Sequence, residues 1–264
     1  MRKMILGFVL TVCFWVTSAL AAVVGHEVTY SAGGVTMKGY LARDEGLTGL
    51  QPGVLVVHEW WGHNDYTRKR ATMLAEMGYV ALAVDMYGDG KEAKHPDEAQ
   101  AFSKEAIQNF PVAKGRFEAA LNLLREQPHV AKTKIAAIGY CFGGGVVLNM
   151  ARQGVDLKGV ASFHGSLDPT QPAVPNGIRS KILVLTGEND PMIPPAKVQA
   201  FRDEMTRAGA EFKVISYPGA THSFTNPDAD ALGREFKLPI AYNPQADQQS
   251  WEALRQFLTQ SFGS

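Results

Sequence analysis

The sequence contains very little cysteine: Cys13 and Cys141 are the only two among 264 residues. Two cysteines allow at most one disulfide, and no CxxC pair is present. This argues against a disulfide scaffold and against a dithiol redox protein. Cys13 lies in an apolar N-terminal segment. If that segment is removed, Cys141 remains as a lone thiol, and its presence needs an explanation.

The sequence also lacks an excess of charge of either sign. It has 26 basic and 26 acidic residues and no run of like charges. Removing Arg2 and Lys3 with the N-terminal segment would leave it slightly acidic. Such a chain presents no basic surface for nucleic acid or for an anionic membrane, so we expect neither as a partner.

Residues 1–21 have the pattern of a secretory signal peptide. Two basic residues precede an uncharged stretch (4–16), and the segment ends in the small-x-small sequence ALA. The apolar stretch is short for a bilayer span. We therefore expect an exported protein, periplasmic or secreted, whose mature part begins near residue 22 and carries no membrane anchor.

The rest of the chain lacks repeats, low-complexity tracts and long linkers, which favours a single domain over residues 22–264. Strand-like and helix-like segments alternate along it. That alternation is typical of an α/β fold, with a mostly parallel twisted sheet and helices on both faces. The expected strands are 53–59, 78–88, 134–140, 158–165, 181–190 and 212–219, and the expected helices are 65–77, 113–127, 144–153, 195–208 and 246–262.

Two segments have other patterns. Residues 89–111 are polar and contain Pro96 and Pro111, which indicates an irregular helical excursion. The alternating segment 35–42 predicts an antiparallel strand at the edge of the sheet. Ligands of such sheets bind beyond the carboxyl ends of the strands, so the residues just past each strand are the candidates for chemistry.

The segment GYCFGGG (139–145) places Cys141 between a predicted strand and a predicted helix. Gly139-x-Cys141-x-Gly143 is the nucleophile-elbow pattern with sulfur in place of the usual serine oxygen. The turn is so tight that side chains at the glycine positions would clash, and the helix N-terminus favours a thiolate. A buried cysteine that only fills space is the alternative, but its place between strand and helix favours a nucleophile.

Asp190 and His222 follow two later strands. Asp190 lies directly after an apolar strand, and His222 lies in a loop beyond the following strand. Cys141, Asp190 and His222 thus occur in the order of α/β-hydrolase triads: nucleophile, acid, base. His222 would move protons to and from the sulfur, while Asp190 would orient the ring and balance its charge. Taken singly, a turn aspartate and a loop histidine are equally good explanations.

Glu59 ends the predicted strand 53–59 beside two tryptophans, so we expect it to be partly buried. A carboxylate in an apolar setting can accept the thiol proton when a substrate arrives. A structural glutamate, bonded to the backbone or to Arg68 or Arg70, is the equal alternative.

The backbone N–H groups of Trp60 and Phe142 would lie where a tetrahedral oxyanion forms. No metal is expected, because HEWWGH misses the HExxH spacing by one residue. His164 also ends a strand, but it precedes Asp190 in the chain. We therefore interpret it as a pocket-wall or hydrogen-bonded structural residue.

Six segments extend in one order over nearly all of the predicted mature chain: HEWWGHNDYTRKRA, GYVALAVDMYG, IGYCFGGG, GENDPMIP, GATHSF and YNPQAD…W…FL. Together they resemble the dienelactone hydrolase family of the α/β-hydrolase fold. By this resemblance, Cys141 matches the family nucleophile, His222 the base and Asp190 its orienting acid. The remaining matches are Glu59 to the glutamate that takes the thiol proton, and Trp60 and Phe142 to the oxyanion-hole positions.

Two arginines that the resemblance implies are missing. Family enzymes that act on dienelactone hold its carboxylate with one arginine in the excursion and one shortly after HSF. This sequence has no arginine from 71 to 115, and Thr225 and Asn226 follow HSF. Lysine and asparagine do not replace the bidentate fork of arginine. We therefore expect a neutral or differently charged ester, lactone or thioester as substrate.

The sequence thus predicts a carboxylic ester or lactone hydrolase that forms an acyl-thioenzyme at Cys141 and needs no cofactor. The alternative is an exported binding protein that kept the fold and lost turnover, which the missing arginines permit. A thiol in a working triad would react with alkylating agents well below pH 8.5, whereas a space-filling thiol would stay inert in the folded protein. Nothing in the residues predicts the oligomeric state.

Overall fold

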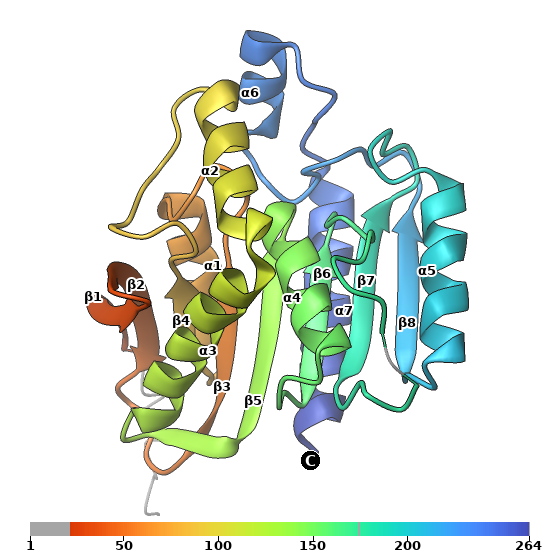
Figure 1. Ribbon diagram of the computed structural model, residues 1–264. Helices are drawn as coiled ribbons and strands as arrows, with labels where there is room; N and C mark the ends of the chain where they lie inside the picture. Colours follow the sequence, from red (N-terminus) through yellow and green to blue (C-terminus); the bar gives the residue numbers. More distant parts are fainter. Residues whose placement is uncertain (1–21, 174, 264) are drawn as a thin grey trace, which may run out of the picture.

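The computed structural model describes residues 22–173 and 175–263, which are organised by one twisted sheet (Figure 1). Its eight strands follow the order β1-β2-β4-β3-β5-β6-β7-β8. The β1–β2 and β2–β4 pairs are antiparallel, and the other neighbouring pairs are parallel. The strands are β1 (Val23–Ala32), β2 (Val35–Asp44), β3 (Gln51–Val57), β4 (Val80–Val84), β5 (Val130–Tyr140), β6 (Gly159–Phe163), β7 (Lys181–Gly187) and β8 (Phe212–Tyr217).

Helices cover both faces of this sheet. Helices α1 and α7 contribute to the buried cluster on one face, and α3, α4 and α5 contribute to the cluster on the other. Helix α6 lies beyond the carboxyl ends of the strands (Figure 1). The helices are α1 (Asp65–Glu76), α2 (Pro96–Gln108), α3 (Phe110–Glu126), α4 (Phe142–Arg152), α5 (Pro195–Arg207), α6 (Ala229–Phe236) and α7 (Pro244–Phe262).

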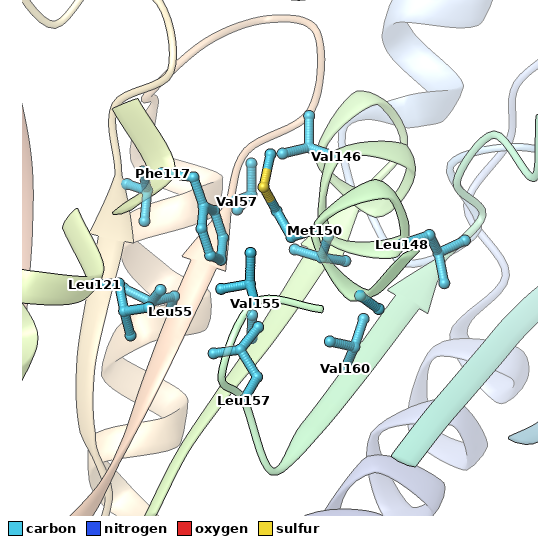
Figure 2. Close-up of a cluster of buried hydrophobic side chains, with 14 of the residues drawn as sticks. Leu55, Val57, Phe117, Leu121, Val146, Leu148, Met150, Val155, Leu157 and Val160 are labelled. Atoms are coloured by element: carbon cyan, nitrogen blue, oxygen red, sulfur yellow. The ribbon is translucent and has the colours of Figure 1, made fainter. Parts of the chain in front are cut away.

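Strand β3 shows how one apolar run supplies both cores. Val54 and Val56 belong to the cluster under α1 and α7, whereas Leu55 and Val57 belong to the cluster under α3 and α4. Figure 2 shows the second cluster, where the β3 side chains meet Phe117 and its neighbours on α3 and α4. Burial of each such side chain stabilises the folded state by about 1.5–3 kcal/mol. Because both faces are covered, the strand has no polar alternation.

The predicted α/β class is confirmed, and two local predictions need correction. The segment 89–111 is irregular mainly over 89–95, because its helical part is the regular helix α2 and α3 already begins at Phe110. Pro96 and Pro111 lie in the first turns of these helices, where a missing N–H needs no acceptor. The segment 35–42 is not the edge of the sheet: β1, which the sequence did not predict, pairs with all of β2 and takes the edge.

Within residues 22–173 and 175–263, no helix is both long and apolar enough to cross a bilayer. The predicted signal peptide, residues 1–21, lies outside the described residues. Export therefore stays a prediction from sequence.

Candidate active site

Cys141 lies in the tight turn between β5 and α4. Its φ of 50° is in the left-handed region, and α4 begins at the very next residue, two positions earlier than predicted. A Cβ on Gly139 would lie 2.2 Å from the carbonyl oxygen of Gly143, and one on Gly143 would lie 2.3 Å from that of Val57. Only glycine fits at both positions, so the sequence pattern has the steric cause that was predicted for it. The thiol is half-buried at the positive end of α4.

One imidazole bridges the sulfur and a carboxylate. The Nε2 atom of His222 lies 3.1 Å from Sγ of Cys141, and its Nδ1 atom lies 2.8 Å from Oδ2 of Asp190. His222 and Asp190 are both buried. Asp190 follows β7 and also accepts the backbone N–H of Met192 at 2.8 Å. The structure thus brings together the three residues that the sequence placed after β5, β7 and β8.

Two neighbouring groups, Cys141 and Asp190, raise the pKa of His222 by more than its burial lowers it. Burial lowers the pKa of this imidazole, but the negative charge of Cys141 and the hydrogen bond and charge of Asp190 raise it to about 10. The raised pKa keeps this ring protonated at neutral pH, as an imidazolium whose Nε2 lies 3.1 Å from the sulfur. This geometry places a proton donor beside the sulfur of Cys141.

Glu59 lies two residues beyond β3 and is 2% exposed, so it is fully buried rather than partly buried. Its Oε1 accepts from the hydroxyl of Ser223 at 3.1 Å, and its Oε2 accepts from Nδ2 of Asn226 at 2.7 Å. Neither Arg68 nor Arg70 is its partner, so the structural alternative predicted from sequence was wrong in its bonding. Burial raises the pKa of this carboxyl, and the two hydrogen bonds and the charge of His222 oppose that rise.

The backbone N–H groups of Trp60 and Phe142 lie just beyond the ends of β3 and β5. Phe142 is the first residue of α4, and Trp60 follows Glu59 in a turn. In the described part of the chain, neither N–H donates to a protein acceptor. N–H groups without a protein acceptor are the kind of donor that an oxyanion hole would require.

A model of the dienelactone hydrolase family matches residues 37–262 of this sequence. The chain belongs to the dienelactone hydrolase family. The solved structure of m3DLH is 35% identical, covers 92% of this chain and 100% of that chain, and has a TM-score of 0.87. A dienelactone hydrolase-like promiscuous phosphotriesterase from metagenomic libraries is 34% identical, with the same coverage and a TM-score of 0.86. Protein usf of Aquifex pyrophilus is 28% identical over 232 residues, which are 86% of this chain and 94% of that protein.

A polar network that the sequence did not reveal holds the loop that contains His222 and Thr225. The hydroxyl of Thr225 lies 2.6 Å from that of Tyr66 and 2.8 Å from Nε2 of His164. The guanidinium of Arg70 donates to the Thr225 carbonyl and to Asp247 of α7, both at 2.6 Å. Of the two roles predicted for His164, the hydrogen-bonded structural one fits, because the ring is fully buried. The only feature of the sequence that pointed to this network was the presence of polar residues in apolar surroundings.

A pocket of about 270 Å³ is lined in part by Phe142, the residue that follows Cys141 in the chain. Its walls come from the end of α2, the start of α3, one side of α4 and the loop after β6, and they are mostly apolar. The one charged side chain among them, Asp168, pairs with Lys197 at 2.6 Å. The pocket lining includes Ile107, Phe110, Ala113, Phe142, Val146 and Met150.

Proposed function

We propose that the protein hydrolyses a small carboxylic ester or lactone, with Cys141 as nucleophile, His222 as proton carrier and Asp190 as the group that orients His222. The observation that carries this proposal is the pair of contacts made by one imidazole, 3.1 Å to the sulfur and 2.8 Å to the carboxylate. Family membership supports a hydrolytic reaction. The free N–H groups of Trp60 and Phe142 support acyl transfer in particular.

The proposed reaction has two steps. The thiolate attacks the carbonyl carbon, a carbon–sulfur bond forms, and the two N–H donors bind the resulting oxyanion. Its collapse breaks the carbon–oxygen bond, and the Nε2 proton of His222 passes to the leaving alkoxide. A water molecule then gives a proton to Nε2 and attacks the thioester, which releases the acid and restores the thiolate and imidazolium.

Mass spectrometry tests this proposal most directly. We expect the peptide that contains Cys141 to gain one butyryl group when the protein is acid-quenched during turnover of p-nitrophenyl butyrate. The release of p-nitrophenol should begin with a burst of about one equivalent, because acylation by an activated ester outpaces thioester hydrolysis. Turnover without any adduct at Cys141 would rule out the acyl-thioenzyme.

Glu59 enters the proposal through its charge. In the present geometry the hydrogen-bond partner of the thiol is His222, and both oxygens of Glu59 are occupied by Ser223 and Asn226. We propose that the charge of the buried carboxylate stabilises the imidazolium of His222. Its role as acceptor of the thiol proton, implied by the resemblance, stays a prediction.

The substrate that best fits these surroundings is uncharged. The two buried arginines at this end of the sheet are already engaged: Arg70 by Thr225 and Asp247, and Arg116 by the carbonyl of Met86 at 2.7 Å. No free guanidinium of these two is left for a substrate carboxylate. The apolar pocket at Phe142 suits a short alkyl or aryl group instead.

We expect a charge at the rim of this pocket to select against longer acyl chains. Ile107 lines the pocket and is 44% exposed, so Ile107→Glu leaves the core unchanged. It should lower kcat/KM for p-nitrophenyl butyrate about tenfold and that for the acetate much less. Val112→Glu is the matched control, because Val112 is 45% exposed and is not part of the pocket lining. Equal effects of both variants on both esters would exclude the pocket as the acyl site.

A further inference from the structure

His58 is a polar ring in an apolar place. It follows β3, has no exposed surface, and lies between the rings of Tyr87 and Phe142 at centroid distances of 4.6 and 5.7 Å. A polar group so fully buried is retained only when its hydrogen-bonding atoms find partners. Both of its nitrogens do.

The partners of His58 define its tautomer. The backbone N–H of Met86 donates to Nε2 at 3.2 Å, so Nε2 carries no proton. Nδ1 must then carry the proton, and it donates to the carbonyl oxygen of Glu59. Burial lowers the pKa of this ring, so it stays neutral and keeps this arrangement. The imidazole is thus a fixed bridge between the β4 end and the Glu59 carbonyl.

The Glu59 carbonyl and the Trp60 N–H belong to one peptide unit. The described chain has no cis peptide bond, so these two groups point in opposite directions from a planar unit. Anchoring the oxygen therefore fixes the direction of the N–H. The Gly62 N–H also donates to this oxygen at 3.2 Å, and the Tyr87 hydroxyl donates to the carbonyl of Trp60 at 3.0 Å. The peptides on both sides of Trp60 are thus held in place.

His58 also contacts the second oxyanion position. Its own carbonyl accepts the backbone N–H of Gly143 at 3.0 Å, one residue beyond Phe142. The ring stacks on the Phe142 side chain. One residue therefore connects the turn that carries the Trp60 N–H with the helix start that carries the Phe142 N–H.

We infer that His58 is a positioning residue for the oxyanion hole: its Nδ1–H holds the Glu59 carbonyl so that the Trp60 N–H faces the reacting carbonyl oxygen. This inference rests on the proposed function, in which the Trp60 N–H stabilises the oxyanion. His58 touches neither substrate nor sulfur and acts only through the orientation of this peptide.

Two variants of His58 separate its two hydrogen bonds. His58→Asn places an amide N–H where Nδ1 stands and keeps the bond to Glu59. His58→Gln places an amide oxygen where Nε2 stands, so it keeps the bond from Met86 and loses the one to Glu59. Both variants leave the sulfur, the base and the acid in place.

The measured quantity is the ratio of the rates of two reactions of the same thiol, acylation and alkylation. Acylation by p-nitrophenyl butyrate forms an oxyanion, whereas alkylation by iodoacetamide displaces iodide from a saturated carbon and forms none. For His58→Gln we expect the rate of acylation to fall at least about tenfold and the rate of alkylation to stay within about twofold of wild type. The reason is that loss of one oxyanion-hole donor lowers the rate of acyl transfer by about 100-fold or more. His58→Asn should keep most of the acylation rate. If both reactions fall equally in His58→Gln, or if His58→Asn loses as much acylation as His58→Gln, the inference is wrong.

Two further experiments give a result if His58→Gln does not fold or if the proposed function fails. Tyr87→Phe removes the donor to the Trp60 carbonyl without adding volume, and it should lower the acylation-to-alkylation ratio in the same direction. An unchanged ratio would count against the inference. If the wild-type thiol is alkylated but no ester acylates it, the proposed function fails. Crystal structures of His58→Asn and His58→Gln then decide the role of His58: a Glu59–Trp60 peptide that rotates in His58→Gln but not in His58→Asn would support it, and a peptide that keeps its orientation in His58→Gln would overturn it.

Discussion

Cys141→Ala is expected to lower kcat/KM for p-nitrophenyl esters by roughly 10⁵-fold or more, as happens when the nucleophile of a triad is removed. Without Sγ no carbon–sulfur bond can form, and His222 loses its partner at 3.1 Å. Alanine has the same backbone cost as cysteine at φ 50°, so the elbow itself should persist. Steady-state hydrolysis of p-nitrophenyl butyrate measures the effect, and circular dichroism checks the fold.

Cys141→Ser is the matched control for this loss. It keeps the size of the side chain and supplies an oxygen, but a serine hydroxyl is not ionised beside an imidazolium as a thiol is. We expect activity between those of alanine and wild type. Activity unchanged in Cys141→Ala would mean that another group is the nucleophile. A wild-type protein with a reactive thiol and no turnover of any ester, lactone or thioester would favour the binding protein.

Asp190→Asn is expected to lower kcat by about 10³ to 10⁴-fold, as for the equivalent change in other triads. The amide can donate to Nδ1 of His222, which would favour the wrong tautomer at a ring whose Nδ1 now faces Oδ2 at 2.8 Å.

The substitution should also change the pH profile. The pKa of His222 is raised to about 10, in part by Asp190, so the imidazolium is lost as the pH rises through that value. Removing the carboxylate lowers this pKa, and the alkaline limb of the kcat/KM profile should move to lower pH.

The variant Glu59→Gln, compared with Asp190→Asn, tests the role of the second buried carboxylate. The oxygens of Glu59 bind Ser223 and Asn226 and make no hydrogen bond to His222, so glutamine can preserve part of this bonding. We expect about a tenfold loss of kcat/KM and alkylation of Cys141 that starts about one pH unit higher, because one anion near the imidazolium is gone. A loss as deep as that of Asp190→Asn would instead indicate that Glu59 takes the thiol proton.

The elbow could be predicted from sequence because its cause is local. Gly139 and Gly143 leave no room for a Cβ, and this steric constraint lies within five residues of chain. The positions of Asp190 and His222 followed from a general property of parallel sheets, whose carboxyl ends meet at one edge. The excursion 89–111 was predicted to be helical, but the bounds of α2 were not predicted, although Pro96 lies at a helix start, where proline is favourable.

The partners of the buried polar groups could not be predicted in this way. Glu59 meets Ser223 and Asn226 from a loop more than 160 residues later in the chain. Such contacts depend on how closely two loops approach each other in the folded protein. Neither the residue types nor their spacing in the sequence predicts that approach. The role inferred for His58 depends in the same way on the direction of one peptide, which no sequence pattern reports.

The bond between Arg70 and Asp247 has a consequence for the order of assembly. Arg70 supports the carbonyl of Thr225, three residues after His222, and it is itself held by the last helix of the chain. While a nascent polypeptide emerges, this brace is incomplete until α7 has docked. We therefore expect the sulfur to acquire its acid–base partner only after α7 has been synthesised and has docked, so the thiol should be less reactive before that point.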